Sequence, residues 1–318
     1  MSARALRTTH PAGNGSEVLA PLVQALGSLV QAGVREQSFQ RDPAFIEQVF
    51  PLVRGVNRYF DTDFRGWEHV PRTPCLIVGN HSGGAESNDF AFLLYKWVEE
   101  RGSAAPLYSL TYDLLFGAPV IGPALRRLGC IPASHVNARR ALAMGASVAV
   151  FPGGDYEVFR PWRERNRIDF GGHMGFIRLA IAARVPVVPM TIHGAHQSTL
   201  VLTRGHRLAQ AAGIDRLHVN VFPFVWSIPF GLAPAFVPSV PLPAKVTVHF
   251  GPPLDWSRYR RSHARDPAVL RACYAEITAL MQHTLNRLAR QHPHPVLERL
   301  RHLEPGSAQR RPDKPRAA

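Results

Sequence analysis

The residues best suited to chemistry in this chain lie in a polar turn that follows the apolar run at 75–78. His81, Glu86 and Asp89 share this turn with two glycines. A neutral imidazole can accept a proton through one ring nitrogen while its other nitrogen donates to a carboxylate, which fixes the tautomer. The turn therefore predicts a histidine–carboxylate pair for acid–base chemistry, with either Asp89 or Glu86 as the partner of His81.

A second polar turn follows the strand-like run at 148–151 and contains Gly153, Gly154 and Glu157. Several arginines come after it, and Arg160 lies nearest to the glycines, which makes it the best candidate to bind a substrate phosphate. Loops at the ends of neighbouring strands meet at one edge of an α/β sheet. We therefore expect the two turns to form one active site, in which these four residues bind substrate.

Four sequence blocks occur in an order that resembles the glycerolipid acyltransferase superfamily. They are the Asn-His block at 80–81 with its downstream acid, the block at 128–134, the Phe-Pro-Gly-Gly block at 151–154 and the block at 185–190. The resemblance implies a fold like that of glycerol-3-phosphate acyltransferases. It also implies an O-acyltransferase that moves a fatty acyl group to a hydroxyl of a glycerolipid or another lipid alcohol.

The chain departs from the common family pattern at two places. The family usually has an aspartate five positions after the histidine, where this chain has Glu86, and Asp89 comes three positions later. The Asn-His-Ser-Gly-Gly form resembles a branch that uses the later aspartate, which favours Asp89. Lysophosphatidate acyltransferases usually have glutamate where Gly153 stands, so the third block is more similar to diacylglycerol-type and phytyl-ester-type acyltransferases.

The resemblance implies a direct transfer without a metal or other cofactor. His81 would remove the proton of the acceptor hydroxyl, whose oxygen attacks the thioester carbonyl of the co-substrate, acyl-CoA or acyl carrier protein. Ser82, Gly83 and Gly84 could present backbone N–H groups to the developing oxyanion, because glycine permits close approach of a substrate. The partners expected from this mechanism are an acyl thioester donor and a lipid acceptor.

Two other functions fit parts of the sequence. A serine hydrolase would use Ser82 as its nucleophile, because residues 80–84 resemble a Gly-x-Ser-x-Gly elbow with the first glycine replaced. A non-catalytic lipid-binding protein of the membrane could keep the fold, although His81 with its neighbouring carboxylates argues against this. His193 and His196 have no partner at metal-ligand spacing, so no metal site is expected.

Alternating strand-like and helix-like runs predict the elements that position these residues. Strands are expected over 75–78, 107–110, 147–151, 187–192 and 246–250, and helices over 87–100, 137–144 and 173–183, with helical additions near the two ends over 19–34, 45–59 and 270–288. Such alternation is typical of an α/β fold in which helices flank a layered mixed sheet.

The ends of the chain differ from its middle in composition. Residues 1–17 and 303–318 are rich in small and polar residues without apolar periodicity, so both segments are expected to be disordered. We expect one acyltransferase domain over 18–302, with its core blocks at about 70–255. The three cysteines are far apart and form no Cys-x-x-Cys pair, which indicates neither a disulfide framework nor a zinc site.

The charge of the chain favours an anionic partner. Lysine and arginine number 37 against 23 aspartates and glutamates, which gives a formal net charge of +14. We expect an anionic membrane surface and no nucleic acid, because the cations are not arranged with aromatics on a recognisable nucleic-acid-binding module. No signal peptide is expected at the N-terminus, which favours the cytoplasmic face of the membrane.

A long apolar stretch at 219–242 is interrupted by five prolines. A helix that spans a membrane must satisfy its own backbone hydrogen bonds, and the prolines prevent this. We expect the stretch to line an acyl channel or to enter the membrane interface, with burial in the core as the alternative. The protein is therefore expected to bind the membrane peripherally or by interfacial insertion.

Overall fold

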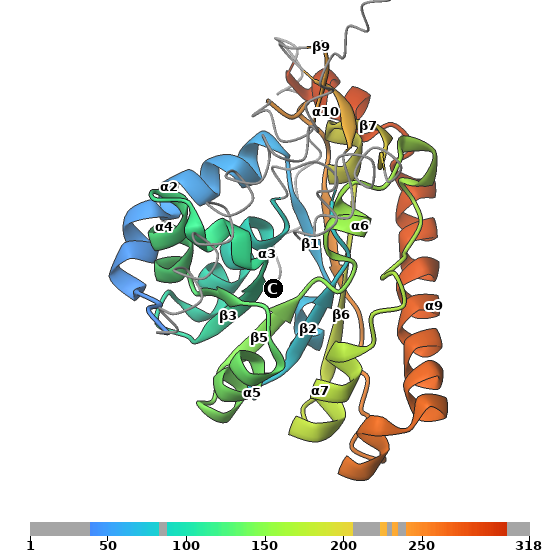
Figure 1. Cartoon of the computed structure of the whole chain (residues 1–318). Coiled ribbons are helices and arrows are strands. Elements are labelled where there is room, and N and C mark those ends of the chain that lie inside the picture. Colours follow the sequence, from blue (N-terminus) through green and yellow to red (C-terminus); the bar gives the residue numbers. More distant parts are fainter. Residues whose placement is uncertain (1–38, 83–87, 206–222, 228–230, 235–239, 304–318) are drawn as a thin grey trace, which may run out of the picture.

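A seven-stranded mixed sheet forms the centre of the computed structural model, which describes residues 39–82, 88–205, 223–227, 231–234 and 240–303 (Figure 1). The strand order is β1-β10-β6-β2-β5-β3-β4. The strands are β1 (Asp63–Arg65), β2 (Leu76–Gly79), β3 (Leu107–Thr111), β4 (Cys130–Pro132), β5 (Ser147–Val150), β6 (Val187–His193) and β10 (Thr247–Phe250). Neighbouring strands are parallel except β10 and β6. The predicted α/β fold with a mixed sheet is confirmed.

Helices flank this sheet (Figure 1). The α-helices are α2 (Pro43–Tyr59), α3 (Asp89–Arg101), α4 (Ile121–Leu128), α5 (His135–Ala143), α6 (Gly154–Val158), α7 (Gly175–Ala183), α9 (Pro267–Gln291) and α10 (Pro295–Leu303). Short 3-10 turns are η1 (Trp67–His69), η2 (Asp113–Gly117), η3 (Trp162–Glu164), η4 (Ala195–Ser198) and η6 (Arg261–Arg265). Among the described residues, no helix is both long enough and apolar enough to cross a membrane.

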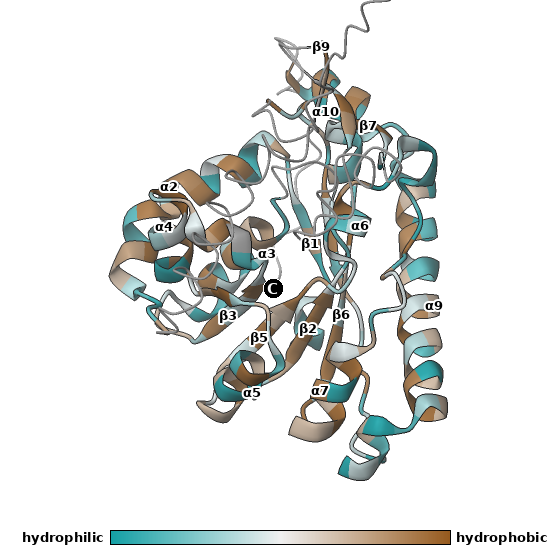
Figure 2. Ribbon diagram, in the orientation of Figure 1, coloured by the Kyte–Doolittle hydropathy of each residue, from teal (hydrophilic) through white to brown (hydrophobic). Residues whose placement is uncertain are grey.

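The side chains of β2 alternate between two apolar cores. Leu76 and Val78 belong to the core that contains residues of α5, α7 and α9, whereas Ile77 packs in the core that contains Phe92 and Trp97 of α3. Both faces of this strand are therefore buried, which explains its continuous apolar sequence. Figure 2 shows the same hydrophobic character along β2, β5 and β6.

A separate three-stranded antiparallel sheet contains β7 (Leu200–Thr203), β8 (Phe224–Ser227) and β9 (Gly231–Pro234). The described parts of the apolar stretch 219–242 therefore contain two strands that its sequence did not predict. Val225 is buried, but Trp226 and its cross-strand neighbour Leu232 are 49% and 64% exposed. Residues 219–222, 228–230 and 235–239 of the stretch lie outside the described residues.

The elements that the sequence predicted in the middle of the chain are present within one to three residues of their expected bounds. The structure adds β1, β4, α4, α6 and α10, which are short, to that set. The helix expected over 19–34 lies outside the described residues. So do the two ends expected to be disordered, except for Leu303, which is the last residue of α10. The single domain over 18–302 stays a prediction.

Candidate active site

Asn80 fixes the end of β2, directly before the catalytic candidate. Its side-chain Nδ2 donates to the Ile192 carbonyl oxygen at 3.0 Å, and the Ile192 N–H donates to Asn80 Oδ1 at 2.8 Å. The backbones of β2 and β6 pair up to Gly79 and Met190, and the Asn80 side chain extends this pairing by one step. Because Asn80 is buried and both of its amide groups are used, it restricts the direction in which the chain leaves the sheet.

His81 and Asp89 form the predicted histidine–carboxylate pair. His81 Nδ1 lies 2.7 Å from Asp89 Oδ2. Asp89 is the first residue of α3, where the helix dipole favours its ionised form, and its side chain is 2% exposed. The His81 side chain is 18% exposed and so stays within reach of a substrate. With Nδ1 directed at a carboxylate, Nε2 is the ring nitrogen suited to proton transfer.

Ser82 contacts the Asp89 carboxylate through both its backbone and its side chain. Its backbone N–H donates to Asp89 Oδ1 and Oδ2 at 3.0 and 3.1 Å, and its hydroxyl also donates to Oδ1. These contacts orient the Asp89 carboxylate and direct the N–H away from a role as oxyanion donor. They also place the Ser82 hydroxyl on the aspartate, whereas a serine nucleophile needs its hydroxyl on the histidine, which argues against the hydrolase alternative.

The first turn has three other expected members. Glu86, Gly83 and Gly84 lie outside the described residues. The structure therefore brings Asp89 to His81, as the resemblance favoured, and leaves the roles of these three residues as predictions.

Phe151 joins the two polar turns, as the sequence predicted. The ring of His81 stacks on that of Phe151 with a centroid distance of 4.9 Å and an interplanar angle of 25°. Phe151 follows β5, the parallel neighbour of β2. The same ring explains Gly79, because a Cβ at that position would lie 2.6 Å from Phe151 Cε1. The second turn therefore forms one wall of the histidine site.

Glu157 and Arg160 lie beneath the backbone of His81. The His81 N–H donates to Glu157 Oε2 at 2.9 Å, and Arg160 donates to the His81 carbonyl oxygen at 3.2 Å. The two side chains form an ion pair at 2.9 Å and are 0% and 1% exposed. Burial raises the pKa of Glu157, and the Arg160 guanidinium opposes this shift. The geometry supports a positioning role for this pair; their expected binding of substrate stays a prediction.

Gly153 leaves the space that Glu157 occupies. A Cβ at position 153 would lie 2.5 Å from Glu157 Oε2 and closer still to the Cβ of Glu157. Gly154 follows with a φ of +50°, in the left-handed region that favours glycine. The second glycine therefore serves the turn into α6, and the first allows the Glu157 carboxylate to reach the His81 backbone. The expected contact of these two glycines with substrate stays a prediction.

His196 belongs to the same network, a role that its sequence context did not predict. Its Nε2 lies 2.9 Å from the backbone oxygen of Arg160. Burial, assisted by the charge of Arg160, lowers the pKa of His196 well below its usual value, so the neutral ring donates this bond. A histidine shortly after β6 was the available signal. Among the residues that the structure describes, no three His, Cys, Asp or Glu form a group suited to a metal ion.

Known proteins share the segment that contains this site. The family model described as Acyltransferase matches residues 61–193, which include His81, Asp89 and Glu157. An uncharacterized protein of Mycobacterium tuberculosis is 32% identical over 254 residues, which cover 79% of this chain and 68% of that protein. The chain belongs to the acyltransferase family. The resemblance to the glycerolipid acyltransferase superfamily is thereby confirmed, and this acyltransferase is an enzyme that uses an acyl donor and a lipid acceptor.

Two further proteins are similar to this acyltransferase. A DGAT1/2-independent enzyme synthesizing storage lipids from Gallus gallus is 28% identical over 128 residues, which cover 40% of this chain and 37% of that enzyme. The crystal structure of the 1-acyl-sn-glycerophosphate acyltransferase PlsC from Thermotoga maritima superposes with a TM-score of 0.46 at 16% identity. The superposition covers 86% of this chain and 93% of that chain.

Proposed function

We propose that this acyltransferase moves a fatty acyl group from acyl-CoA or acyl carrier protein to a hydroxyl of a glycerolipid or another lipid alcohol, with His81 as general base. The observation that carries the proposal is the 2.7 Å contact between His81 Nδ1 and the buried carboxylate of Asp89. An alcohol is a weak nucleophile at neutral pH, and a histidine oriented by a carboxylate is suited to remove its proton.

The proposed reaction has two steps. His81 Nε2 accepts the proton of the acceptor hydroxyl while the hydroxyl oxygen attacks the thioester carbonyl carbon, and Asp89 stabilises the resulting imidazolium. The tetrahedral intermediate then expels the thiolate as the C–S bond breaks, and the thiolate takes the proton from His81. Backbone N–H groups of Gly83 and Gly84 are proposed to bind the oxyanion. Neither step needs a metal or another cofactor.

Two observations support a lipid acceptor at an anionic membrane surface. The Gallus gallus relative is named as an enzyme that synthesizes storage lipids. The net charge of +14 favours binding to anionic lipid, and the exposed Trp226 and Leu232 offer apolar contacts for an interface. We propose that the protein acts at the cytoplasmic face of the membrane as a peripheral or interfacially inserted enzyme.

The proposed function is tested by release of free thiol from acyl-CoA, and in parallel from acyl carrier protein, with a panel of lysophospholipids, monoacylglycerol, diacylglycerol and long-chain alcohols. Thiol release should depend on one class of acceptor and should fall about a hundredfold or more in His81→Ala, which is the scale of lost general-base catalysis. The fold of the variant is checked by circular dichroism. Near-normal turnover in a folded His81→Ala protein would overturn the mechanism.

A further inference from the structure

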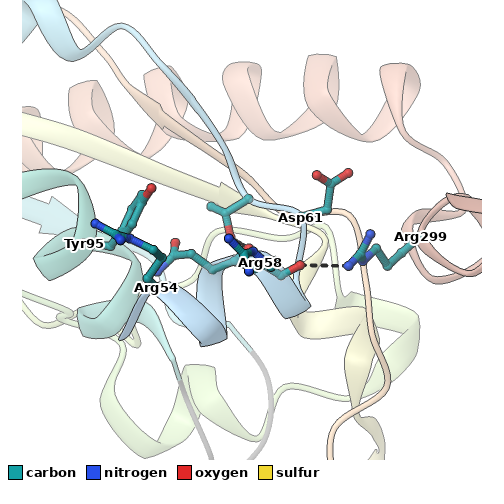
Figure 3. Close-up of a pocket in the computed structure, with 7 residues that line it drawn as sticks. Arg54, Arg58, Asp61, Tyr95 and Arg299 are labelled. Carbon is teal, nitrogen blue, oxygen red and sulfur yellow. Dashed lines mark hydrogen bonds between the residues drawn. The ribbon is translucent and has the colours of Figure 1, made fainter. Parts of the chain in front are cut away.

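A cavity of about 390 Å³ lies beside α2, and its lining includes no residue of the polar turns (Figure 3). The residues that line it come from α2 and the segment after it, from α3 and from the C-terminal helix α10. They are Arg54, Asn57, Arg58, Asp61, Thr62, Tyr95 and Arg299. Three of these seven side chains are guanidinium groups, and the elements that contribute them are far apart in the sequence.

The positive charge of the cavity is only partly compensated. Asp61 is the one carboxylate among the described lining residues, and Lys245 Nζ already lies 3.3 Å from its Oδ2. Arg54 contacts Glu99 at 3.4 Å, in a pair that is 53% and 40% exposed, so water and salt weaken it. The lining therefore has an excess of positive charge, which favours an anionic ligand.

Arg58 contributes most clearly to this excess. Its guanidinium has no ion pair or hydrogen bond with any residue that the structure describes, whereas its backbone oxygen accepts a bond from Arg299 at 2.8 Å. That bond brings the two arginines together at the end of α2 (Figure 3). The hydroxyl of Tyr95 also lacks a hydrogen-bond partner within the described ranges and can donate to an anion.

We propose that this cavity binds the phosphate group of a phosphate ester, with Arg54, Arg58 and Arg299 as its cationic ligands. Guanidinium groups match the oxygen geometry of phosphate through paired N–H donors. The volume lies within the range of roughly 300–1,000 Å³ that is usual for small-molecule sites, which leaves space for the organic part of the ester.

The position of the cavity is compatible with two sources of phosphate. Tyr95 lies six residues after Asp89 in α3, or about 9 Å further along the helix axis. The ester is therefore either the headgroup of an anionic lipid or the nucleotide part of the thiol donor, and one binding experiment distinguishes them.

The experiment is isothermal titration calorimetry of the full chain at low salt with two probes. Glycerol 3-phosphate represents a lipid headgroup, and adenosine 3′,5′-bisphosphate represents the nucleotide of CoA without its thiol. Arg58→Gln should lower the affinity for the probe that binds by about tenfold or more, because one charge-assisted contact is lost. Arg178→Gln, at an exposed position of α7, is the matched control and should bind as the unchanged protein does.

Binding of only one probe identifies the source, and binding of both supports a general phosphate site. Arg58 is the informative position, since its side chain has no polar contact with the described residues whose loss would destabilise α2, and melting temperatures check this. Absence of binding for both probes would overturn the proposal, as would equal affinities for the unchanged protein and Arg58→Gln. Since no acyl transfer is measured, either result leaves the proposed reaction at His81 untouched.

Discussion

His81 contacts two acidic side chains that have different tasks. Asp89 accepts from the imidazole and orients the ring, whereas Glu157 accepts from the backbone N–H and orients the peptide. The second contact depends on Arg160, which neutralises Glu157 and also donates to the His81 carbonyl oxygen. The direction of the histidine is therefore determined at both its ring and its backbone.

The task of Asp89 is tested by comparison with Glu86. Asp89→Asn should lower the turnover number much more than Glu86→Gln, with binding of the donor largely retained in both. An amide in place of the carboxylate favours the wrong tautomer of the imidazole and no longer stabilises the imidazolium. The measurement is turnover at saturating acyl donor. A larger loss for Glu86→Gln would assign the orienting task to Glu86.

The task of Glu157 is tested through its buried partner. Glu157→Ala leaves Arg160 without a counter-charge at a position that is 1% exposed, which should lower the free energy of unfolding by about 3–5 kcal/mol. The double variant Glu157→Ala/Arg160→Met should recover most of that stability, because no buried charge is left alone. Urea denaturation and turnover are measured together.

If Glu157 positions His81, the turnover number of the double variant stays low although its stability is recovered. Recovery of turnover together with stability would instead show that the ion pair is only structural.

Residue types and spacing predicted that His81 pairs with Asp89 or Glu86 and that the two polar turns meet, because the chemistry of each turn is local in the sequence. The contact of Glu157 with the His81 backbone could not be predicted in this way. It depends on the parallel register of β2 and β5 and on the space left by Gly153, and these are properties of the folded chain. The contact of the Ser82 N–H with Asp89 could not be predicted for the same reason, since the direction of an N–H in a turn depends on where α3 begins.

At the scale of elements, residues at and after the end of β6 support the catalytic turn. The Ile192 carbonyl oxygen accepts from Asn80 Nδ2, the Ile192 N–H donates to Asn80 Oδ1, and His196 in η4 contacts the backbone oxygen of Arg160. His193, the last residue of β6, is buried beside them, and this burial lowers its pKa to about 4. The neutral His196 is therefore part of the support for the catalytic turn.

Buried neutral histidines predict a loss of stability in acid. The unfolded chain protonates His193 near pH 6.5, whereas the folded chain does so only near pH 4. Its contribution is present above pH 6.5 and is lost as the pH falls towards 4, a difference of about 3 kcal/mol. Urea midpoints between pH 7.5 and 5.5 should fall with pH, and less steeply in His193→Gln. An unchanged slope in that variant would contradict this reasoning.

Strands with a long apolar run and helices with clear periodicity were predicted, whereas the shortest elements were not. β1 and β4 have three residues each, which is too short for an alternating pattern to stand out, and β8 and β9 lie in the stretch that prolines interrupt. These strands depend on pairing with partners elsewhere, as β4 does with β3. Their prediction would have needed knowledge of the sheet order.

At the scale of the whole molecule, charge and exposed apolar surface favour the same kind of partner. The excess of cations attracts an anionic bilayer, and this part of the binding is screened by salt. The exposed face of β8 and β9 adds an apolar part that salt does not screen. Trp226 and Leu232 are cross-strand neighbours there, and tryptophan is well suited to the membrane interface.

We expect the protein to sediment with anionic vesicles and to bind them more weakly as salt is raised. Trp226→Ser and Leu232→Ser should each lower the partition coefficient by about tenfold at any salt concentration, because an apolar side chain that would enter the interface is removed. Val136→Ser is the matched control. It removes an apolar side chain that is 64% exposed on α5, at the opposite end of the molecule in Figure 1.

The two parts of the binding are separated by measuring all variants at low and high salt. If β8 and β9 enter the interface, the two strand variants lose affinity at both salt concentrations, and Val136→Ser behaves as the unchanged protein does. An equal loss in Val136→Ser would show that the effect is not specific to this sheet. Absence of vesicle binding at low salt would refute the membrane location itself, because electrostatic attraction of a chain with net charge +14 is strongest under that condition.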